Sequence, residues 1–361
     1  MLYHLLYPLH EHVPLFNVFR YITFRAAAAI VTALLLSWVL GPRFIRTLRR
    51  MSVGQNIRDV GPQAHQVKAG TPTMGGLLIL FATLVPTLLW GSLDNVYVWI
   101  VVLITAAYGA IGFADDYIKV RKRRNLGLTA RSKMLLQIAA GSIMALALLV
   151  LPQGYGFNST LTFPFFKHFV VTLGYLYIPF VVVVLVGASN AVNLTDGLDG
   201  LAIGASTIAA ATYAVFTYVA GNRVIAAYLQ VPYVPGVGEV AVFCGSLIGA
   251  GLGFLWFNSH PAEVFMGDVG SLALGAAIGS VAVIAKQEIL LVLVGGLFVL
   301  EALSVIIQVA SFKLRGKRVF RMSPLHHHFE LSGWAEPKVI VRFWILAILF
   351  ALLSLSTLKL R

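Results

Sequence analysis

The sequence has few charged residues and a single cysteine. Charged residues make up 11% of the 361 residues, whereas hydrophobic residues make up 59% and the mean hydropathy is +0.86. A soluble globular domain carries about 25% charged residues, so this composition excludes an ordinary soluble domain and predicts a polytopic membrane protein. The cysteine, Cys244, lies in an apolar run. Because the sequence has no second cysteine, an intramolecular disulfide framework is excluded.

Several other sequence patterns are missing. We find no nucleic-acid motif, no heptad array and no segment large and polar enough to fold alone as a soluble domain. Residues 1–20 lack the basic start and the small-residue cleavage site of a secretory signal peptide. We expect them to form a short interfacial segment, and we predict one integral membrane domain over residues 1–361.

Long apolar runs are what the sequence has instead. A membrane-spanning helix needs about 20 mostly apolar residues, and about ten such runs can be marked. They predict an all-α fold with a cavity between helices rather than a sheet-based site. The predicted spans are 22–42, 75–93, 96–116, 132–151, 168–188, 199–219, 239–257, 264–284, 287–312 and 339–358.

The distribution of basic residues predicts the orientation. Lysines and arginines crowd the loops after spans one, three and nine, whereas the opposite loops hold only Lys167, Arg223 and Lys286. By the positive-inside rule the crowded loops are cytoplasmic and both termini are periplasmic. Two explanations fit the net charge of +13. The basic residues attract anionic lipid, or they form a basic surface that gathers an anionic, phosphate-bearing substrate.

Asp115 and Asp116 stand side by side at the end of the third predicted span. Like charges repel, and both carboxylates lose hydration at a membrane boundary, so such a pair indicates a shared cation, metal ion or proton. Lys119 follows Asp115 by one helical turn, where its ammonium group can neutralise a phosphate or keep an aspartate ionised. This string is the first candidate for a catalytic centre.

Two further connections carry carboxylates to the same predicted face. After span five the sequence supplies Asn190, Asn193, Asp196 and Asp199 with glycines among them, and Asp268 stands beside two glycines at the start of span eight. Helix capping is the alternative for Asp196 and for Asp268, because acidic side chains favour a helix start. Capping does not account for two amides and two carboxylates together, so we favour a shared site.

A histidine triplet, His326-His327-His328, follows Pro324 in the last predicted cytoplasmic loop. Adjacent residues do not all point at one ion in a regular chain, and no cysteine accompanies them, which disfavours a transition-metal site. We expect the imidazoles to hydrogen-bond phosphate or sugar. Pro324 should keep the chain out of a regular helix at that point.

Two more features lie near the predicted cytoplasmic side or inside a span. The string from Lys68 to Gly76, with Thr73 near its centre, offers a lysine, hydroxyl groups and glycines, but no Gly-Lys-Ser/Thr follows, so it is not a P-loop. We expect it to form one wall of a cavity. Glu301 lies inside span nine and should face a cavity or a partner rather than lipid, although the sequence suggests no role for it.

These groups together predict a hard cation. Several aspartates without cysteine ligands favour Mg²⁺, which usually takes one or two carboxylates and shares its other positions with phosphate oxygens and water. A lipid-soluble phosphate acceptor would explain why such a site is embedded in a membrane bundle. The predicted reaction class is phosphoryl transfer at the membrane surface, driven by positioning and charge neutralisation.

Four strings, at 113–119, 190–200, 265–268 and 324–330, together resemble the bacterial phospho-N-acetylmuramoyl-pentapeptide transferases. That family belongs to the polyprenyl-phosphate N-acetylhexosamine-1-phosphate transferase superfamily. The resemblance covers nearly the whole chain and implies ten spans, outward termini, a homodimer and a broken ninth helix beside a lipid groove. Gly295-Gly296 suits such a break.

The resemblance also implies a reaction in the bacterial inner membrane, with the active site facing the cytoplasm. Phospho-N-acetylmuramoyl-pentapeptide would pass from its UDP-linked precursor to undecaprenyl phosphate, giving lipid I and UMP with Mg²⁺, the first membrane step of peptidoglycan synthesis. We favour direct attack by the lipid phosphate over a covalent phospho-enzyme, because the phosphate is already anionic and a metal ion and a carboxylate can activate it.

The resemblance assigns roles to single residues. Asp268 would bind the magnesium ion, while Asp115 and Asp116 would form a catalytic pair that also reaches the metal. Lys119 would bind phosphate, and the three histidines, His326, His327 and His328, would bind on the sugar-phosphate side. The implied nucleoside pocket consists of Lys68, Asn193, Asp196, Leu198 and Phe265. As further substrate-binding candidates we add Asn190 and Asp199 from the string 190–200, and Thr73 from the string that begins at Lys68.

Three alternatives remain open on the sequence. A transferase of the same superfamily moves N-acetylglucosamine-1-phosphate onto the same lipid, and the histidine triplet favours the muramoyl branch over it. An intramembrane prenyltransferase uses paired Asp-rich repeats, whereas this chain has Asp115-Asp116 followed by Lys119. A transporter would place its charges near the bilayer centre rather than at one interface.

Overall fold

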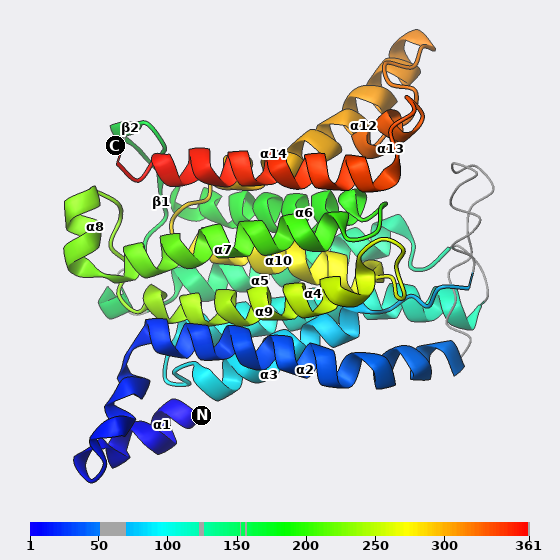
Figure 1. Cartoon of the computed structure of the whole chain (residues 1–361). Helices are drawn as coiled ribbons and strands as arrows, with labels where there is room; N and C mark the ends of the chain where they lie inside the picture. The colour runs from blue at the N-terminus through cyan, green and yellow to red at the C-terminus, as the bar shows by residue number, and fades with distance from the viewer. Residues whose placement is uncertain (51–69, 123–125, 152, 156, 360–361) are drawn as a thin grey trace.

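The structure, a computed structural model, describes residues 1–50, 70–122, 126–151, 153–155 and 157–359. It is a bundle of long, roughly parallel or antiparallel helices (Figure 1). A short helix α1 (Leu2–Leu6) and two 3₁₀ turns precede the bundle. The longer helices are α2 (Ile22–Arg50), α3 (Gly76–Trp90), α4 (Val96–Arg121), α5 (Ala130–Leu149), α6 (Tyr177–Thr195), α7 (Leu201–Gly221), α9 (Val240–Asn258), α10 (Gly267–Ile284), α12 (Gly296–Arg315) and α14 (Glu336–Ser356).

Shorter elements lie at the two ends of this bundle. The strands β1 (Thr160–Phe163) and β2 (Phe166–Thr172) form an antiparallel hairpin in which Thr160 pairs with Thr172. The hairpin and α8 (Arg223–Leu229) lie at one end, where α1 and the end of α14 also lie (Figure 1). Helix α13 (Leu325–Glu330) lies at the other end, and α11 (Leu291–Val294) precedes α12.

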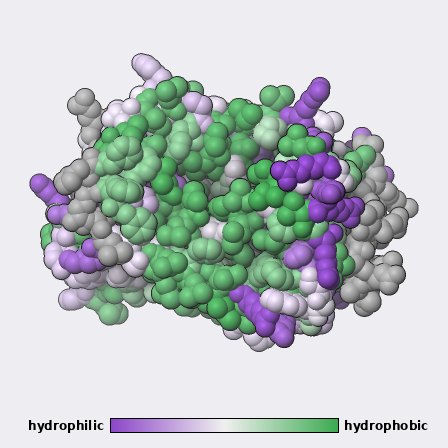
Figure 2. Space-filling view, turned by 90° about the horizontal axis from the view of Figure 1, so that it is seen from above, coloured by the Kyte–Doolittle hydropathy of each residue, from purple (hydrophilic) through white to green (hydrophobic). Residues whose placement is uncertain are grey.

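The surface matches a membrane environment. Among the described residues, nine helices are long and apolar enough to cross a membrane, and α3, with 15 residues, is a shorter apolar helix. Large apolar side chains such as Val31, Leu103 and Ile306 are exposed on the outside of the bundle. Figure 2 shows a broad apolar band between more hydrophilic ends, as expected for a surface in contact with lipid. The predicted all-α polytopic fold is confirmed.

Helix α10 runs through the centre of the bundle and is almost wholly buried, between α4, α6, α3 and α7. Glycines allow its close contacts, because a Cβ on Gly76 of α3 would lie 2.1 Å from the amide nitrogen of Gly270. On the α6 side, a Cβ on Gly275 would lie 2.5 Å from Ala188 O. Small residues at such crossings let helix backbones approach in a membrane bundle, so α10 brings polar groups of three helices to one place.

The structure corrects the bounds of two predicted spans. The fifth span was predicted from residue 168, but Phe166–Thr172 form β2 and the helix begins at Tyr177. The β-branched residues of 160–172 fit a paired strand, which the apolar-run criterion does not separate from a helix. The third span continues to Arg121, beyond the predicted end at 116, because Asp115, Asp116 and Lys119 pair with one another inside the protein.

The ninth span is interrupted, as the glycine pair suggested. Helix α11 ends at Val294 and α12 begins at Gly296, with Gly295 between them. Figure 1 shows α12 leaving the bundle at an angle, whereas α13 lies back near the start of α14. The α12 residues nearest the break, Leu297, Phe298 and Glu301, are buried, whereas Ile306 and Leu314 are exposed.

Two buried ion pairs hold the end of the bundle that carries the hairpin. Lys286, just after α10, lies 2.8 Å from Glu288 and donates to the hydroxyl of Tyr177. Arg25 of α2 forms two hydrogen bonds of 2.6 Å with Glu239. Because Asp268 begins α10 and Lys286 follows its end, the pair with Glu288 is about 27 Å from the aspartates.

Candidate active site

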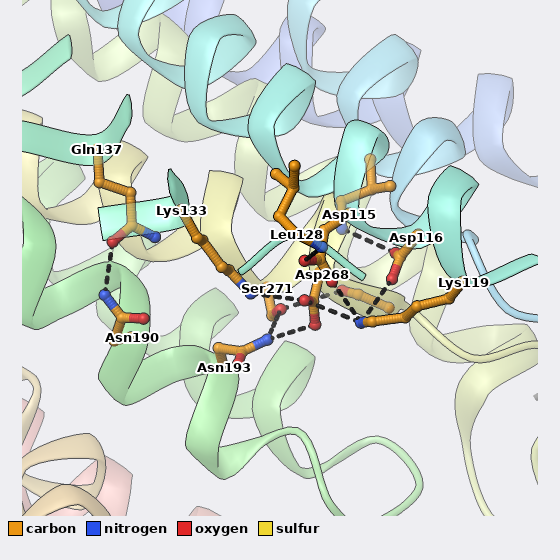
Figure 3. A network of polar contacts seen from close by, with 12 residues as sticks. Asp115, Asp116, Lys119, Leu128, Lys133, Gln137, Asn190, Asn193, Asp268 and Ser271 are labelled. Atoms are coloured by element: carbon orange, nitrogen blue, oxygen red, sulfur yellow. Dashed lines mark hydrogen bonds and ion pairs between the residues drawn. The ribbon is translucent and has the colours of Figure 1, made fainter. Parts of the chain in front are cut away.

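Asp115, Asp116 and Asp268 come together where α4 meets the start of α10 (Figure 3). One carboxylate oxygen from each lies within 4.8 Å of the others. Gly112, one turn before the aspartate pair, permits this approach, because a Cβ there would lie 2.2 Å from Asp268 O. Asp115 and Asp116 are each only 3% exposed. The predicted meeting of these three carboxylates is therefore present in the fold.

Two lysines neutralise the aspartates. The Nζ atom of Lys119 lies 2.6 Å from Asp115 Oδ2, 3.2 Å from Asp116 Oδ1 and 3.0 Å from Asp268 Oδ2. Lys133, in the first turn of α5, donates to Asp268 Oδ2 at 2.6 Å. In the sequence, Lys133 is one of the basic residues that follow span three, where membrane topology alone accounts for it. The signal that could have singled it out is its position inside the first turn of an apolar helix.

Each aspartate has one oxygen held by the protein and one that faces the lysines. Asp115 Oδ1 accepts from the backbone amide of Leu128 at 2.8 Å, and Asp116 Oδ2 accepts from the amide of Val269 at 3.2 Å. Asp268 Oδ1 accepts from Asn193 Nδ2 at 2.8 Å. The remaining three oxygens converge on Lys119 Nζ, so the protein fixes three carboxylates around one position of positive charge.

This donor set fits a divalent cation. All three convergent atoms are carboxylate oxygens, the ligand type that Mg²⁺ prefers. Lys119 Nζ already contacts an oxygen of each aspartate, which shows that the geometry accommodates a cation between them. Their second oxygens are fixed by hydrogen bonds, and such outer partners orient metal ligands. Asp115, Asp116 and Asp268 are therefore the residues that could hold the ion.

The loop before α3 forms a neighbouring wall. The Phe265 amide donates to Pro72 O at 2.8 Å, and Gly75 N donates to Phe265 O at 2.8 Å. Thr73 lies against Gly267, where a Cβ would meet Thr73 Oγ1 at 3.0 Å and Asp116 Oδ2 at 2.5 Å. Thr73 thus lies near Asp116, and Phe265 is tied by its backbone to the loop that carries Thr73. Lys68, the remaining candidate in this loop, lies outside the described residues.

Comparison with known proteins gives a consistent picture. Residues 98–286 match the model of glycosyl transferase family 4, and residues 68–80 match phospho-N-acetylmuramoyl-pentapeptide-transferase signature 1. Proteins named phospho-N-acetylmuramoyl-pentapeptide-transferase from Citrifermentans bemidjiense and Pelobacter propionicus are 60% and 61% identical to the chain over 361 residues, the full length of each protein. One from Koribacter versatilis is 57% identical over 380 aligned positions, again covering both chains completely.

The chain belongs to the phospho-N-acetylmuramoyl-pentapeptide-transferase family. The family model spans α4 to Lys286 and so includes all three aspartates, Lys119 and Lys133. The signature spans the loop that holds Thr73 and the first residues of α3. Family membership thus falls on the segments that build the aspartate cluster.

Asn190 and Asn193, predicted for the connection after span five, lie in the last two turns of α6 and bond to different helices. Asn193 reaches Asp268 and Ser271, each at 2.8 Å, whereas Asn190 donates to Gln137 Oε1 at 2.8 Å (Figure 3). Leu198 is buried at 3% exposure. Asn193 is therefore in contact with the aspartate cluster, and Asn190 lies one turn further from it.

Asp199 belongs to a second cluster. Its Oδ2 lies 3.2 Å from His260 Nδ1 and accepts from the Ala262 amide at 3.1 Å. Glu336, at the start of α14, lies 3.6 Å from His260 Nδ1 and accepts from the Asp199 amide at 3.1 Å. Asp199 thus ties the α6–α7 turn to the loop before α10 through its side chain and to α14 through its backbone amide.

Asp196 follows the last residue of α6, and its carboxyl group is a weaker acid than that of an ordinary aspartate. Burial, reinforced by the negative charges of Asp268, Asp116 and Asp199, raises the pKa of Asp196 from 3.8 to about 8. The side chain remains partly accessible at the protein surface. An aspartate that is largely neutral near pH 7 can donate a hydrogen bond as well as accept one.

This raised pKa predicts how stability depends on pH. The unfolded chain binds fewer protons than the folded chain between pH 4 and 8, so stability should fall as the pH rises through that window. In metal-free protein, Asp196→Asn should remove this component and raise Tm at pH 8 by about 2–4 °C, equivalent to about 1 kcal/mol. Thermal unfolding at pH 5 and pH 8 measures it, and equal Tm changes for both proteins would contradict the prediction.

The histidine triplet does not form one site. All three residues lie in α13, which begins directly after Pro324. His326 is buried against Glu301, His327 Nδ1 lies 2.8 Å from Glu330 Oε2, and His328 Nδ1 accepts from the Arg321 amide at 3.2 Å. The three imidazoles thus have three separate sets of neighbours. Pro324 begins a short regular helix here, because it precedes the first turn rather than interrupting one.

Proposed function

We propose that this chain transfers phospho-N-acetylmuramoyl-pentapeptide from its UDP-linked precursor to undecaprenyl phosphate, giving lipid I and UMP. The observation that carries the proposal is the convergence of three carboxylate oxygens at one end of a membrane-spanning bundle. A lipid-borne phosphate can reach such a position from the bilayer, and a nucleotide can reach it from water. The full-length relatives named for this activity support the same conclusion.

We propose that the cofactor is Mg²⁺, held by Asp268 with Asp115 and Asp116. When bound, the ion supplies charge neutralisation for the diphosphate. Lys119 and Lys133 hold phosphate oxygens beside the carboxylates, and Asn193 keeps Asp268 oriented through its 2.8 Å hydrogen bond. We assign the nucleotide side to Thr73, Asp196, Leu198 and Phe265, and the nearness of Thr73 and Asp196 to the aspartates supports this assignment.

In the chemical step, an oxygen of the lipid phosphate forms a bond to the sugar-bearing phosphorus of the nucleotide. The bond from that phosphorus to the bridging oxygen breaks, and the bridging oxygen leaves with UMP. The aspartate pair keeps the lipid phosphate deprotonated and in line, so no covalent phospho-enzyme is required. Positioning and charge neutralisation carry the rate enhancement.

We further propose that the aspartate end faces the cytoplasm of the bacterial inner membrane and that the chain works as a homodimer. Exposed basic residues lie at this end, including Lys313 and Arg315 in the last turn of α12 and Arg318 after it. By the positive-inside rule this end faces inward, which is where UDP-linked precursors are found. The dimer rests on the family resemblance alone.

The test is release of UMP by the purified chain in detergent. UMP should appear when the UDP-linked muramoyl-pentapeptide, undecaprenyl phosphate and Mg²⁺ are all present, and should fall to background when the lipid phosphate is omitted. UDP-N-acetylglucosamine in place of the muramoyl precursor tests the alternative branch of the superfamily. UMP release from that nucleotide alone would overturn the proposed substrate.

A further inference from the structure

Ser271 is connected to the aspartate cluster through another side chain. It lies on α10, three residues after Asp268 and on the same face of the helix, and it is 0% exposed. Its Oγ donates to Gly267 O at 3.0 Å and accepts from Asn193 Nδ2 at 2.8 Å. The same nitrogen of Asn193 donates to Asp268 Oδ1 at 2.8 Å (Figure 3). Three hydrogen bonds therefore link the backbone of α10 to Asp268 by way of Ser271 and Asn193.

These bonds fix the direction in which the Asn193 amide faces. The Asp268 carboxylate lies beside the ammonium groups of Lys119 and Lys133, and an ionised carboxylate only accepts hydrogen bonds. Ser271 donates its single proton to the backbone, so its oxygen is an acceptor for Asn193. Both N–H bonds of the amide are thus engaged, and a half-turn of the amide group would break both hydrogen bonds.

The packing of α6 on α10 leaves side-chain rotation as the main freedom of Asn193. A Cβ added to Gly275, one turn after Ser271, would lie 2.5 Å from Ala188 O of α6. The two helix backbones are therefore in direct contact close to Asn193, and this contact fixes where its side chain begins. What remains to be fixed is the rotation of the amide, and Ser271 supplies the second hydrogen bond that fixes it.

We propose that Ser271 is a positioning residue for the cation centre, acting through Asn193 on Asp268. With Oδ1 held by Asn193, the Asp268 carboxylate keeps its Oδ2 directed at the lysines and at the other two aspartates. Partners behind metal ligands orient them, and losing such a partner typically costs about 10–100-fold in metal affinity or activity. The inference rests on the proposed function and adds to it a residue outside the aspartate cluster that sets the affinity for the cation.

Ser271→Ala tests this role, because it removes the hydroxyl group with little change in volume. The Asn193 amide then loses one acceptor and can rotate away from Asp268. We expect the dissociation constant of Mn²⁺ from the full chain to rise about 10-fold, measured from the electron paramagnetic resonance signal of the free ion. An unchanged dissociation constant would overturn the proposal.

Ser280 offers a matched control on the same helix. It is also 0% exposed, and its Oγ donates to a helix carbonyl, Ala277 O, at 2.8 Å. It lies 12 residues beyond Asp268, which is about 18 Å along α10. Ser280→Ala makes the same chemical change, and the dissociation constant of Mn²⁺ should stay within about twofold of the parent. An equal rise in both variants would assign the effect to disturbance of α10 and overturn the positioning role.

A double-mutant cycle shows whether Ser271 acts through Asn193. Asn193→Ala alone should weaken Mn²⁺ binding at least as much as Ser271→Ala does. Adding Ser271→Ala to Asn193→Ala should change the dissociation constant by less than about twofold, because the amide that the serine orients is already gone. A second rise of about 10-fold in that background would show that Ser271 acts by another route and would overturn the proposal.

Kinetics separate cation positioning from a part in the chemical step. Raising the Mg²⁺ concentration should restore kcat of Ser271→Ala to within about threefold of the parent, because the lost affinity is offset by concentration. A fall in kcat that Mg²⁺ does not restore would overturn the positioning role. A parent that binds Mn²⁺ but releases no UMP would overturn only the proposed transfer, since Mn²⁺ binding is measured without substrates.

Discussion

Asp268→Asn is expected to lower the rate of UMP release by about 10²–10³-fold or more. Asp268 is the one carboxylate that contacts both lysines and Asn193, through Oδ2 at 3.0 and 2.6 Å and through Oδ1 at 2.8 Å. Asparagine keeps the size and one acceptor but removes the negative charge that holds a divalent cation. Two lysines would then face only two carboxylates, and repulsion would further disfavour the ion.

The rate is measured with saturating substrates over a range of Mg²⁺ concentrations. Asp94→Asn is the matched control, because Asp94 is 86% exposed between α3 and α4 and pairs with His4 rather than with the cluster. It should leave the rate within about twofold. Near-parental activity of Asp268→Asn at ordinary Mg²⁺ would remove Asp268 from the catalytic centre.

Lys119→Met carries the second large expected effect, a loss of kcat of about 10²-fold. Lys119 Nζ contacts an oxygen of each of the three aspartates, so its loss leaves their mutual repulsion uncompensated when no substrate is bound. In the transfer step the same ammonium group would neutralise phosphate oxygens. The KM for undecaprenyl phosphate should therefore rise together with the fall in kcat.

Lys122→Met provides the comparison for this substitution. Lys122 ends α4 and is exposed, three residues beyond Lys119, so its charge meets water rather than the cluster. Steady-state kinetics with varied lipid phosphate should show parental constants within about twofold for Lys122→Met. If both substitutions change the kinetic constants equally, then Lys119 acts only through general surface charge.

The aspartate cluster could be predicted from the sequence, because a carboxylate in a membrane protein is confined to the few depths where it can be solvated. Asp115, Asp116 and Asp268 all end or begin apolar runs on the face that the basic loops define, and few positions in a bundle offer such groups solvation. Lys133 was missed because a basic residue near a span is usually explained by topology. Only the packing of α5 beside α4 and α6 shows that its ammonium group reaches Asp268.

The hydrogen-bond partners of individual side chains could not be predicted from the sequence, because they depend on how the helices pack. Asn190 and Asn193 stand one turn apart, yet one bonds Gln137 and the other Asp268, because α5 and α10 pack on different sides of α6. Glu301 suggested no role, since its partner His326 is 25 residues away and meets it only after α12 leaves the bundle. The hairpin at 160–172 was likewise hidden, because its apolar residues resemble the start of a span.

The central claim is that the three aspartates bind one divalent cation at the transfer site. Equilibrium binding of Mn²⁺ to the purified full chain, followed by the electron paramagnetic resonance signal of the free ion, tests it most directly. We expect one ion bound per chain in the parent and in Asp94→Asn, and loss of that ion in Asp268→Asn. Equal binding by all three proteins would contradict the account.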